Sequence, residues 1–479
     1  MHGHHGPAVE ADAHTDTRPW GPMIVALVAQ VLVVIDISVV NTAMPTIGHE
    51  LGLGSSDLQW VVTAYLLLSG GCLLLGGRIA DLISRRTVFL TGLALFTTAS
   101  LFTGFASGAA ELIGGRAAQG AAAALMTPAA LSIISTTYTG TQKARGLALW
   151  GAIGGLGIAV GVALGGVLTT WASWEAIFWI NVPIGVLAIA ATFHVVAKDQ
   201  KGPAGLAQFD VPGALVGVGS LATLMFTLAR VESHGWASVQ TAVGLGVAGI
   251  LMVAFVFIEG RATQPLVHPH TWKISSLVSS TTVMLGITGL LMAVVFLTSI
   301  FGQTALGYSA LESGLAFLPL AVTLVVGTHL AAHSSAHLPV RTIAAIGLAI
   351  VSGGGLLLSR ADSTSSYGGG ILPGLCLVGL GAGLVFAAVA GTAMNGIPAT
   401  HAGMASGFLM TGHEVGAALG VAVLSAVAGT AGNLTAASGV VEAYSRGSMA
   451  ITAIAVVFAA VAAVWMPAGK ADAAHMHLH

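Results

Sequence analysis

Fourteen long apolar segments follow one another along this chain of 479 residues, separated by short polar stretches. A helix of about 20 apolar residues is long enough to cross the hydrocarbon core of a bilayer. The segments are continuous rather than alternating in hydropathy, which excludes membrane-spanning β-strands. We therefore predict an all-α integral membrane protein with transmembrane helices at 22–47, 58–78, 87–107, 110–137, 146–170, 176–197, 211–230, 238–259, 275–302, 311–332, 340–359, 369–393, 402–428 and 447–467.

The composition agrees with a membrane location and excludes several other classes of protein. Only 7% of the residues are charged and 55% are hydrophobic, whereas soluble domains carry about 25% charged residues. The net charge of −2 leaves no basic surface, so we expect no nucleic-acid partner. The chain has no Gly-x4-Gly-Lys-Ser/Thr loop, which argues against direct coupling to ATP. We expect neither an enzyme nor a cofactor.

The cysteine and histidine residues do not lead us to predict a metal site. Cys72 and Cys376 lie inside apolar segments, where they are interpreted as small hydrophobic side chains. Histidines cluster at both chain ends, where solvated tails and weak metal-binding tracts are the alternatives. Three further histidines share one helical face and are either polar helix-end residues or a pH-sensing or metal-binding group: His329, His333 and His337.

The distribution of Lys and Arg predicts the orientation in the membrane. With the N-terminus inside, three basic residues fall in outer loops, namely Arg230, Arg360 and Arg446. Twelve fall in cytoplasmic segments: Arg18, Arg78, Arg85, Arg86, Lys143, Arg145, Lys198, Lys201, Arg261, Lys273, Arg341 and Lys470. Because cytoplasmic loops carry the excess of positive charge, both termini are predicted to be cytoplasmic.

Two polar linkers, Lys198–Gln208 and Arg261–Lys273, divide the helices into groups of six, two and six. Two similar halves with a site between them are typical of secondary transporters. The predicted organisation is therefore a disordered cytoplasmic tail, a six-helix bundle, two extra helices with their linkers, a second six-helix bundle and a second tail. Their bounds are 1–19, 20–197, 198–274, 275–467 and 468–479.

Asp36 lies halfway along the first apolar segment, with no other Asp, Glu, Lys or Arg between Arg18 and Glu50. A carboxylate at this depth costs several kcal/mol, and such residues face a bundle interior or a wet cavity and mark an ion or substrate path. Asp36 is therefore the first proton-coupling candidate. It either carries the proton or orients the group that does.

Arg116 lies inside the fourth apolar segment and needs a buried partner, because an isolated cation at that position would be very costly. Asp36 and Gln119 are the candidate partners. Arg116 either acts as a packing clamp or tunes the proton affinity of a nearby carboxylate.

Glu414 is the second intramembrane carboxylate, beside His413 near the middle of the thirteenth segment. Three interpretations remain open: a proton or cation site facing a cavity, a hydrogen-bonded clamp between helices, or a helix placed wrongly in the sequence.

Five segments resemble the motifs of one transport family. The loop Gly77–Arg86 has the spacing of the signature loop of the major facilitator superfamily, Gly-x-x-x-Asp-x-x-Gly-Arg-Arg. Val34–Pro45 resembles the first-helix motif of its fourteen-helix drug:H+ antiporters, the branch that includes quaternary-ammonium exporters. Gly115–Gly120 is similar to its buried-arginine motif, and Phe178–Gly185 continues the pattern. The fifth helix resembles the antiporter motif through Gly157, Gly161, Gly165 and Gly166.

Several positions depart from these motifs. Leu82 replaces a basic residue and Ser84 replaces the glycine of the signature loop. Val162 stands where the antiporter motif has proline, which removes an expected kink. Glu175 and Ala176 stand where Arg-Trp is usual.

The resemblance implies a major facilitator fold in a bacterial inner membrane, and proton-coupled efflux of amphipathic drugs or metabolites by a monomer. It implies a switch loop containing Gly77, Asp81, Arg85 and Arg86, although an anchor with a turn is the simpler interpretation of these residues. The glycine ladder is either ordinary small-residue packing or a mobile interface between the halves. Substrate-cavity candidates are Asn41, Gln119 and His413.

Two alternatives to efflux remain open. A proton-linked importer or symporter of the same fold is disfavoured by the glycine pattern and the number of spans. A membrane sensor that transports nothing is disfavoured by the lack of a soluble signalling domain.

Overall fold

The structure, a computed structural model, describes residues 18–468 except for 54, 199–209, 264, 266, 268–270, 272, 336, 396 and 432–436. Most of the two predicted tails and of the first linker therefore lies outside the described residues. Within the described residues every element is helical. The first group comprises α1 (Gly21–Leu51), α2 (Ser55–Leu82), α3 (Arg85–Thr103), α4 (Ala109–Thr137), α5 (Gly140–Trp171), α6 (Ala176–Trp179) and α7 (Asn181–Val195).

Two further helices follow, α8 (Val211–His234) and α9 (Val239–Glu259). The last group comprises α10 (Ser275–Thr304), α11 (Ala310–Leu315), α12 (Leu318–Ser334), α13 (Val340–Leu358), the π-helix η3 (Tyr367–Ile371), α14 (Leu372–Ala393), the 3-10 helix η4 (Ala399–His401), α15 (Ala402–Gly429) and α16 (Ala437–Trp465).

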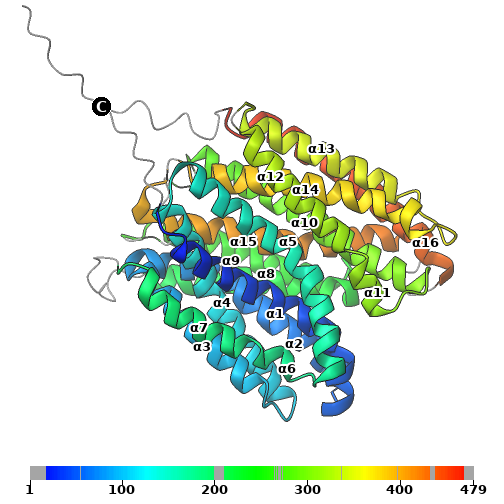
Figure 1. Cartoon of the computed structure of the whole chain (residues 1–479), viewed down its shortest axis with the longest axis horizontal. Helices are drawn as coiled ribbons and strands as arrows, with labels where there is room; N and C mark the ends of the chain where they lie inside the picture. The colour runs from blue at the N-terminus through cyan, green and yellow to red at the C-terminus, as the bar shows by residue number, and fades with distance from the viewer. Residues whose placement is uncertain are drawn as a thin grey trace, which may run out of the picture.

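The predicted fourteen-helix membrane fold is confirmed. Thirteen segments of the described chain are long and apolar enough to cross a membrane. The fourteenth is α5, a helix of 32 residues that packs against α1 on one side and α12 on the other. The beginning of α1 and the end of α16 lie at the same end of the bundle (Figure 1), as an even number of crossings requires.

Two predicted spans contain an irregular turn but remain continuous, as Ala176–Val195 and Glu312–Ser334. The turn lies at Ile180 between α6 and α7 in the sixth span, and between α11 and α12 in the tenth. Pro183 lies in the first turn of α7, and Pro319 lies in the first turn of α12. Proline has no N–H to donate to the preceding turn, so the regular hydrogen-bond pattern is locally incomplete there.

The helices form two groups that meet along two seams. In the first group α4 packs on α2 and α3, and α1 packs on α5; in the second, α14 packs on α12 and α13, and α10 packs on α15. Figure 1 shows the first group in blue to green and the second in green to red. Across the groups, α15 contacts α2 and α4 at one seam, while α5 contacts α12 and α14 at the other.

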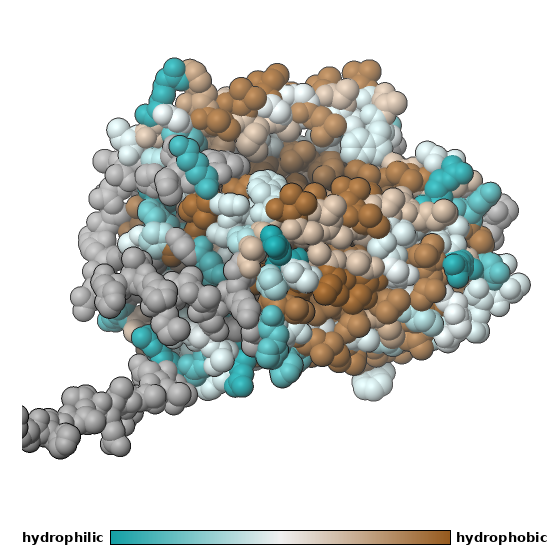
Figure 2. All heavy atoms as spheres, turned by 90° about the horizontal axis from the view of Figure 1, so that it is seen from above, coloured by the Kyte–Doolittle hydropathy of each residue, from teal (hydrophilic) through white to brown (hydrophobic). Residues whose placement is uncertain are grey.

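The outer surface is apolar where lipid is expected. Figure 2 shows apolar side chains over the middle of one face and hydrophilic side chains towards its two ends. On α9 the exposed fractions of Val239, Ile250 and Val253 are 75%, 70% and 72%. Side chains of this kind are stable on a surface only when lipid covers them.

Glycine allows α10 and α15 to approach until their backbones touch. A Cβ atom on Gly420 would lie 2.2 Å from the carbonyl oxygen of Gly289 and 2.3 Å from its Cα. Contacts with backbone atoms cannot be relieved by a side-chain movement. Small residues at such positions are the usual basis of helix association in membranes.

We expect Gly420→Ala to lower the stability of the protein in detergent, because the methyl group forces α10 and α15 apart. Overpacking of this kind costs about 1–3 kcal/mol. Thermal unfolding checks this. Gly429→Ala in the same helix is the control, since nothing lies within 4 Å of its added Cβ. Equal stability of the two variants would contradict the close approach.

Candidate proton-coupling site

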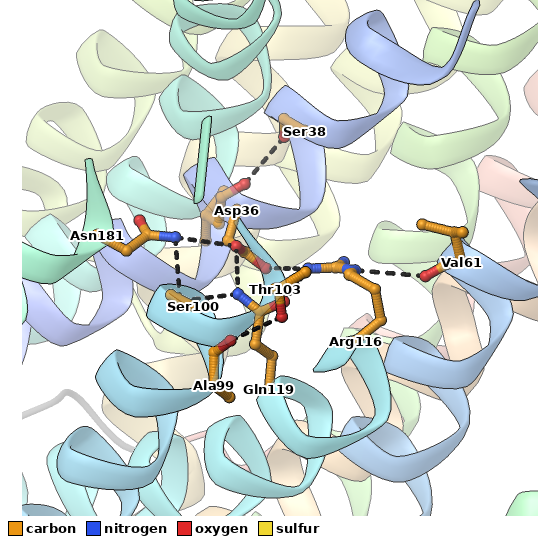
Figure 3. A network of polar contacts seen from close by, with 10 residues as sticks. Asp36, Ser38, Val61, Ala99, Ser100, Thr103, Arg116, Gln119 and Asn181 are labelled. Atoms are coloured by element: carbon orange, nitrogen blue, oxygen red, sulfur yellow. Dashed lines mark hydrogen bonds and ion pairs between the residues drawn. The ribbon is translucent and has the colours of Figure 1, made fainter. Parts of the chain in front are cut away.

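Asp36 lies at the centre of a buried polar network within the first helix group (Figure 3). The residue is 1% exposed. Its Oδ2 accepts a hydrogen bond from Arg116 Nη1, which also forms an ion pair with it. Its Oδ1 accepts hydrogen bonds from Gln119 Nε2 and Asn181 Nδ2, both at 3.0 Å. Both carboxylate oxygens are therefore occupied by donors from two other helices.

Arg116 is fixed by contacts on every side of its guanidinium group. Besides Asp36, Nη1 donates to Gln119 Oε1 at 3.0 Å, and Nε donates to the carbonyl oxygen of Val61 at 3.3 Å. The guanidinium carbon lies 4.3 Å from the centre of the Tyr65 ring, within the range of a cation–π contact. The predicted partners of Arg116, Asp36 and Gln119, are thus both in contact with it.

The glycines beside Arg116 bring its helix close enough for these contacts. A Cβ on Gly115 would lie 2.1 Å from Thr103 Oγ1 of α3, and one on Gly120 would lie 2.3 Å from the carbonyl oxygen of Tyr65 of α2. Side chains at either position would push α4 away from its neighbours. Packing thereby explains the glycines at both ends of the buried-arginine motif Gly115–Gly120.

Ser100 completes the network from α3. Its hydroxyl oxygen accepts hydrogen bonds from Gln119 Nε2 at 2.8 Å and from Asn181 Nδ2 at 3.4 Å. The residues Ser100 and Gln119 are fully buried, and Asn181 is 1% exposed. Gln119 therefore belongs to the Asp36 network and does not line a solvent-filled cavity in this state.

Glu414 occupies a different position, at the contact of α15 with α2 and α8. A Cβ on Gly70 of α2 would lie 3.5 Å from Glu414 Cβ and 3.3 Å from Met225 Cε of α8. Glu414 Oε1 lies 3.4 Å from His413 Nδ1, and their side chains are 20% and 32% exposed. Glu414 is thus partly accessible, unlike Asp36, and the structure does not bring the two carboxylates into contact.

Asp81 joins the two helix groups where the end of α2 meets the start of α15. Its Oδ1 accepts from the amide of Gly403 at 2.9 Å, and its Oδ2 accepts from the amide of Met404 at 2.7 Å. These are the second and third residues of α15, whose own N-cap, His401, makes no side-chain capping bond. A carboxylate here satisfies free N–H groups and the positive end of the helix dipole.

The other switch-loop residues lie around this contact. Gly77 packs directly on α15, since its Cβ would lie 2.2 Å from the carbonyl oxygen of Gly403. Arg85 Nη2 lies 3.9 Å from Asp81 Oδ1. Arg86 instead donates to the carbonyl oxygen of Phe193 at 2.9 Å, so it ties α3 to α7 within the first group.

The departure at Ser84 has a structural reason. Ser84 is the N-cap of α3, and its Oγ accepts from the Thr87 amide at 3.3 Å. Its backbone is extended, a conformation that any residue adopts. Serine therefore fulfils the capping role at the position where the motif usually has glycine.

Comparison with known proteins agrees with this geometry. The model of the Major Facilitator Superfamily matches residues 26–421. The chain belongs to the Major Facilitator Superfamily.

The similar relatives in the superfamily are named for export or resistance. The chain is 38% identical over 411 residues to the cephamycin export protein CmcT of Amycolatopsis lactamdurans, covering 85% of each chain. It is 37% identical to the puromycin resistance protein pur8 of Streptomyces alboniger, covering 86% of this chain and 82% of the relative. It is 31% identical to the multidrug resistance protein Stp of Mycobacterium tuberculosis, covering 83% and 73%.

A solved structure of the superfamily has the same fold. The human organic anion transporter MFSD10 superimposes with a TM-score of 0.64 at 15% sequence identity, covering 92% of this chain and 99% of that chain.

The superfamily's glycine ladder faces the first helix. A Cβ on Gly157 would lie 2.3 Å from Val34 Cγ1, and one on Gly161 would lie 2.5 Å from Ser38 Cβ. Gly165 is buried and Gly166 half-buried in the same helix. One residue of α5 that meets the other group is Gly151, whose Cβ would lie 3.2 Å from Phe386 Cβ of α14. Gly157 and Gly161 pack instead against α1.

Sequence reasoning missed three residues of this candidate site: Ser100, Asn181 and Tyr65. The usable signal for Asn181 was a lone amide in an apolar segment. Asn41 lies in α1, but its side chain is outside the described part of the structure. Among the described residues no group of three or more His, Cys, Asp or Glu could hold a metal ion.

We expect Tyr65→Leu to destabilise the protein by about 2 kcal/mol, the value of a desolvated cation–π contact, because Arg116 loses the ring beneath it. Tyr65→Phe keeps the ring and removes only a hydroxyl that has no hydrogen-bond partner among the described residues, so its stability should match the parent. Thermal unfolding followed by Trp fluorescence compares the stability of the parent protein and the two variants. An equal loss in both variants would show that the hydroxyl, not the ring, supports Arg116.

Proposed function

We propose that this protein is a proton-coupled exporter of amphipathic small molecules, antibiotics among them. The observation that carries the proposal is the Asp36 carboxylate, buried in the membrane and held by Arg116, Gln119 and Asn181. Intramembrane carboxylates in this setting mark proton or substrate paths. The names of the relatives support export as the direction of transport and small molecules as the cargo.

Protonation of Asp36 and its contact with Arg116 compete for the same oxygen. A proton on Oδ2 turns an acceptor into a donor and removes the negative charge that balances Arg116. Arg116 must then move or find other partners, and its contacts with Val61 and Tyr65 on α2 transmit that movement. In this mechanism α2 carries the change from the proton site to the cytoplasmic switch loop.

The Asp81 contact is the gate of this mechanism. We take the end of the bundle that contains Asp81 as cytoplasmic, with both termini on that side, because the Lys and Arg residues cluster there. With Asp81 bound to Gly403 and Met404, the cytoplasmic side is closed between α2 and α15. Rocking of the six-helix bundles 20–197 and 275–467 about a central site would break this contact and admit substrate.

In this proposal Glu414 and His413 both face the substrate, and Glu414 is the second proton-coupling residue. Both are partly exposed, which a group that meets cargo requires, and Met225 of α8 lies beside them. An adaptable thioether suits varied apolar cargo. The protein would act as a monomer in a bacterial cell membrane, with protons and lipid as its other partners and without enzymatic chemistry.

We expect Asp36→Asn to insert into the membrane and to lose proton-driven efflux. Asn keeps the shape and one acceptor, but it leaves Arg116 without a counter-charge, at a cost of about 3–5 kcal/mol of stability. Uptake of a fluorescent cationic dye into energised inverted vesicles, with and without a collapsed proton gradient, measures the activity.

The double variant Asp36→Asn with Arg116→Gln separates coupling from folding. Removing both charges should restore stability without restoring transport. Asp362→Asn, in a solvent-exposed loop, is the control and should transport normally. Wild-type efflux in Asp36→Asn would refute the coupling role, and dye leaving the inverted vesicles on energisation would favour an importer.

A further inference from the structure

The two extra helices cover only one of the two seams between the helix groups. Helix α8 contacts both α2 and α15, the pair that forms the gated seam. A Cβ on Gly71 of α2 would lie 3.5 Å from the backbone of Ala222, and α8 packs on α15 through Leu228, Val231 and Ala422. We call the pair α8–α9, with its connecting loop, the hairpin.

The outer half of the hairpin contacts both helix groups, since Phe226 of α8 lies against Trp60 of α2 with ring centroids 5.5 Å apart. Trp236, in the loop between α8 and α9, donates from Nε1 to the carbonyl oxygen of Ala422 at 3.2 Å. Ala422 also lies in the apolar cluster with Leu228 and Val231. The connecting loop is therefore bonded to the second helix group, while α8 also packs on the first.

The inner end of the hairpin converges on the gate itself. Phe255 of α9, Val267 of the following segment and Met404 of α15 form one buried cluster, 3%, 1% and 3% exposed. Leu74 and Leu75 of α2 pack against the same cluster. Met404 is also one of the two residues whose amide Asp81 binds.

Glu259 fixes this cluster in place. It is the last residue of α9 and is 5% exposed. Its Oε2 accepts from the Val267 amide at 3.0 Å, which returns the chain after α9 to the side of Met404. This bond holds the segment after α9 in place, because a buried backbone amide without an acceptor would be costly.

Charges from two other helices face Glu259. A Cβ on Gly213 would lie 2.8 Å from Glu259 Oε1 and 2.3 Å from Asp210 Oδ2, so two carboxylates face each other across Gly213. Arg78 of α2 is 5% exposed and interacts electrostatically with both Asp81 and Glu259. Arg78 thus carries a positive charge that acts on both the carboxylate that caps α15 and the carboxylate that holds the hairpin.

We propose that Glu259 is a positioning residue of the cytoplasmic gate, through which the hairpin stabilises the bond of Asp81 to the start of α15. This inference rests on the gate described under the proposed function. Glu259 keeps Val267 packed on Met404 and shares Arg78 with Asp81. The hairpin is then a third part of the gate, bonded to α15 through its connecting loop and packed against both α2 and α15.

Hydrogen–deuterium exchange of the peptide containing Gly403 and Met404, in detergent-solubilised full-length protein, tests the inference. Asp81→Asn, which removes the capping charge, sets the largest expected increase in exchange. We expect Glu259→Ala to raise the exchange rate about tenfold, because a charged hydrogen bond that supports the cap is lost. Glu259→Gln keeps an acceptor for the Val267 amide but removes the negative charge that acts on Arg78. Comparison of the two variants therefore separates the effect of the hydrogen bond from that of the charge.

Trp236→Phe is the matched control, since it removes one hydrogen bond from the opposite end of the same hairpin and should leave this peptide unchanged. Wild-type exchange in both Glu259 variants, with an increase in Asp81→Asn, would overturn the role of Glu259 and keep the gate. Wild-type exchange in Asp81→Asn would overturn the gate itself. Neither result depends on a transport assay.

Discussion

The ion pair of Asp36 and Arg116 is the interaction on which the first helix group depends. Neither charge could be buried alone, and the pair is supplemented by Gln119, Asn181 and the carbonyl oxygen of Val61. A buried pair of this kind adds little net stability compared with apolar side chains, but loss of one partner is very costly. Such a pair is therefore suited to a switch, because a single proton changes it from balanced to unbalanced.

The proposed gate at Asp81 also depends on a buried carboxylate. Asp81 binds two backbone amides and the positive end of a helix that belongs to the other group, and Arg85 lies 3.9 Å from its Oδ1. Helix α2 carries both devices, with Tyr65 beside Arg116 and Asp81 about four turns later. In the proposed mechanism, a rigid helix between the two lets an event at Asp36 reach the Asp81 end of the bundle without an intervening chain of mobile side chains.

Much of the fold could be predicted because its determinants are local. Apolar length specifies each span, and the pairing of Arg116 with Asp36 followed from the cost of a buried cation. The irregular turns at Ile180 and before α12 were not predicted, because proline in the first turn of a helix looks the same in sequence as proline within a longer apolar run. Gln119 was predicted both as a partner of Arg116 and as a cavity residue, since an amide can complete a network or line a cavity, and its bonds to Arg116 and Ser100 place it in the network. The Glu259 contacts join four separate segments and leave no periodic signal.

Helix α15 does not carry its own N-terminal cap, and this has a consequence for how the gate opens. When Asp81 leaves, the amides of Gly403 and Met404 lose their acceptor in a region where Met404 is almost fully buried. Two unpaired N–H groups in an apolar surrounding cost several kcal/mol, so the separated state is stable only if water replaces the carboxylate. In the proposed mechanism, wetting of the Asp81 end of the bundle is therefore part of the opening step, and the rate of opening should depend on water activity as well as on the proton.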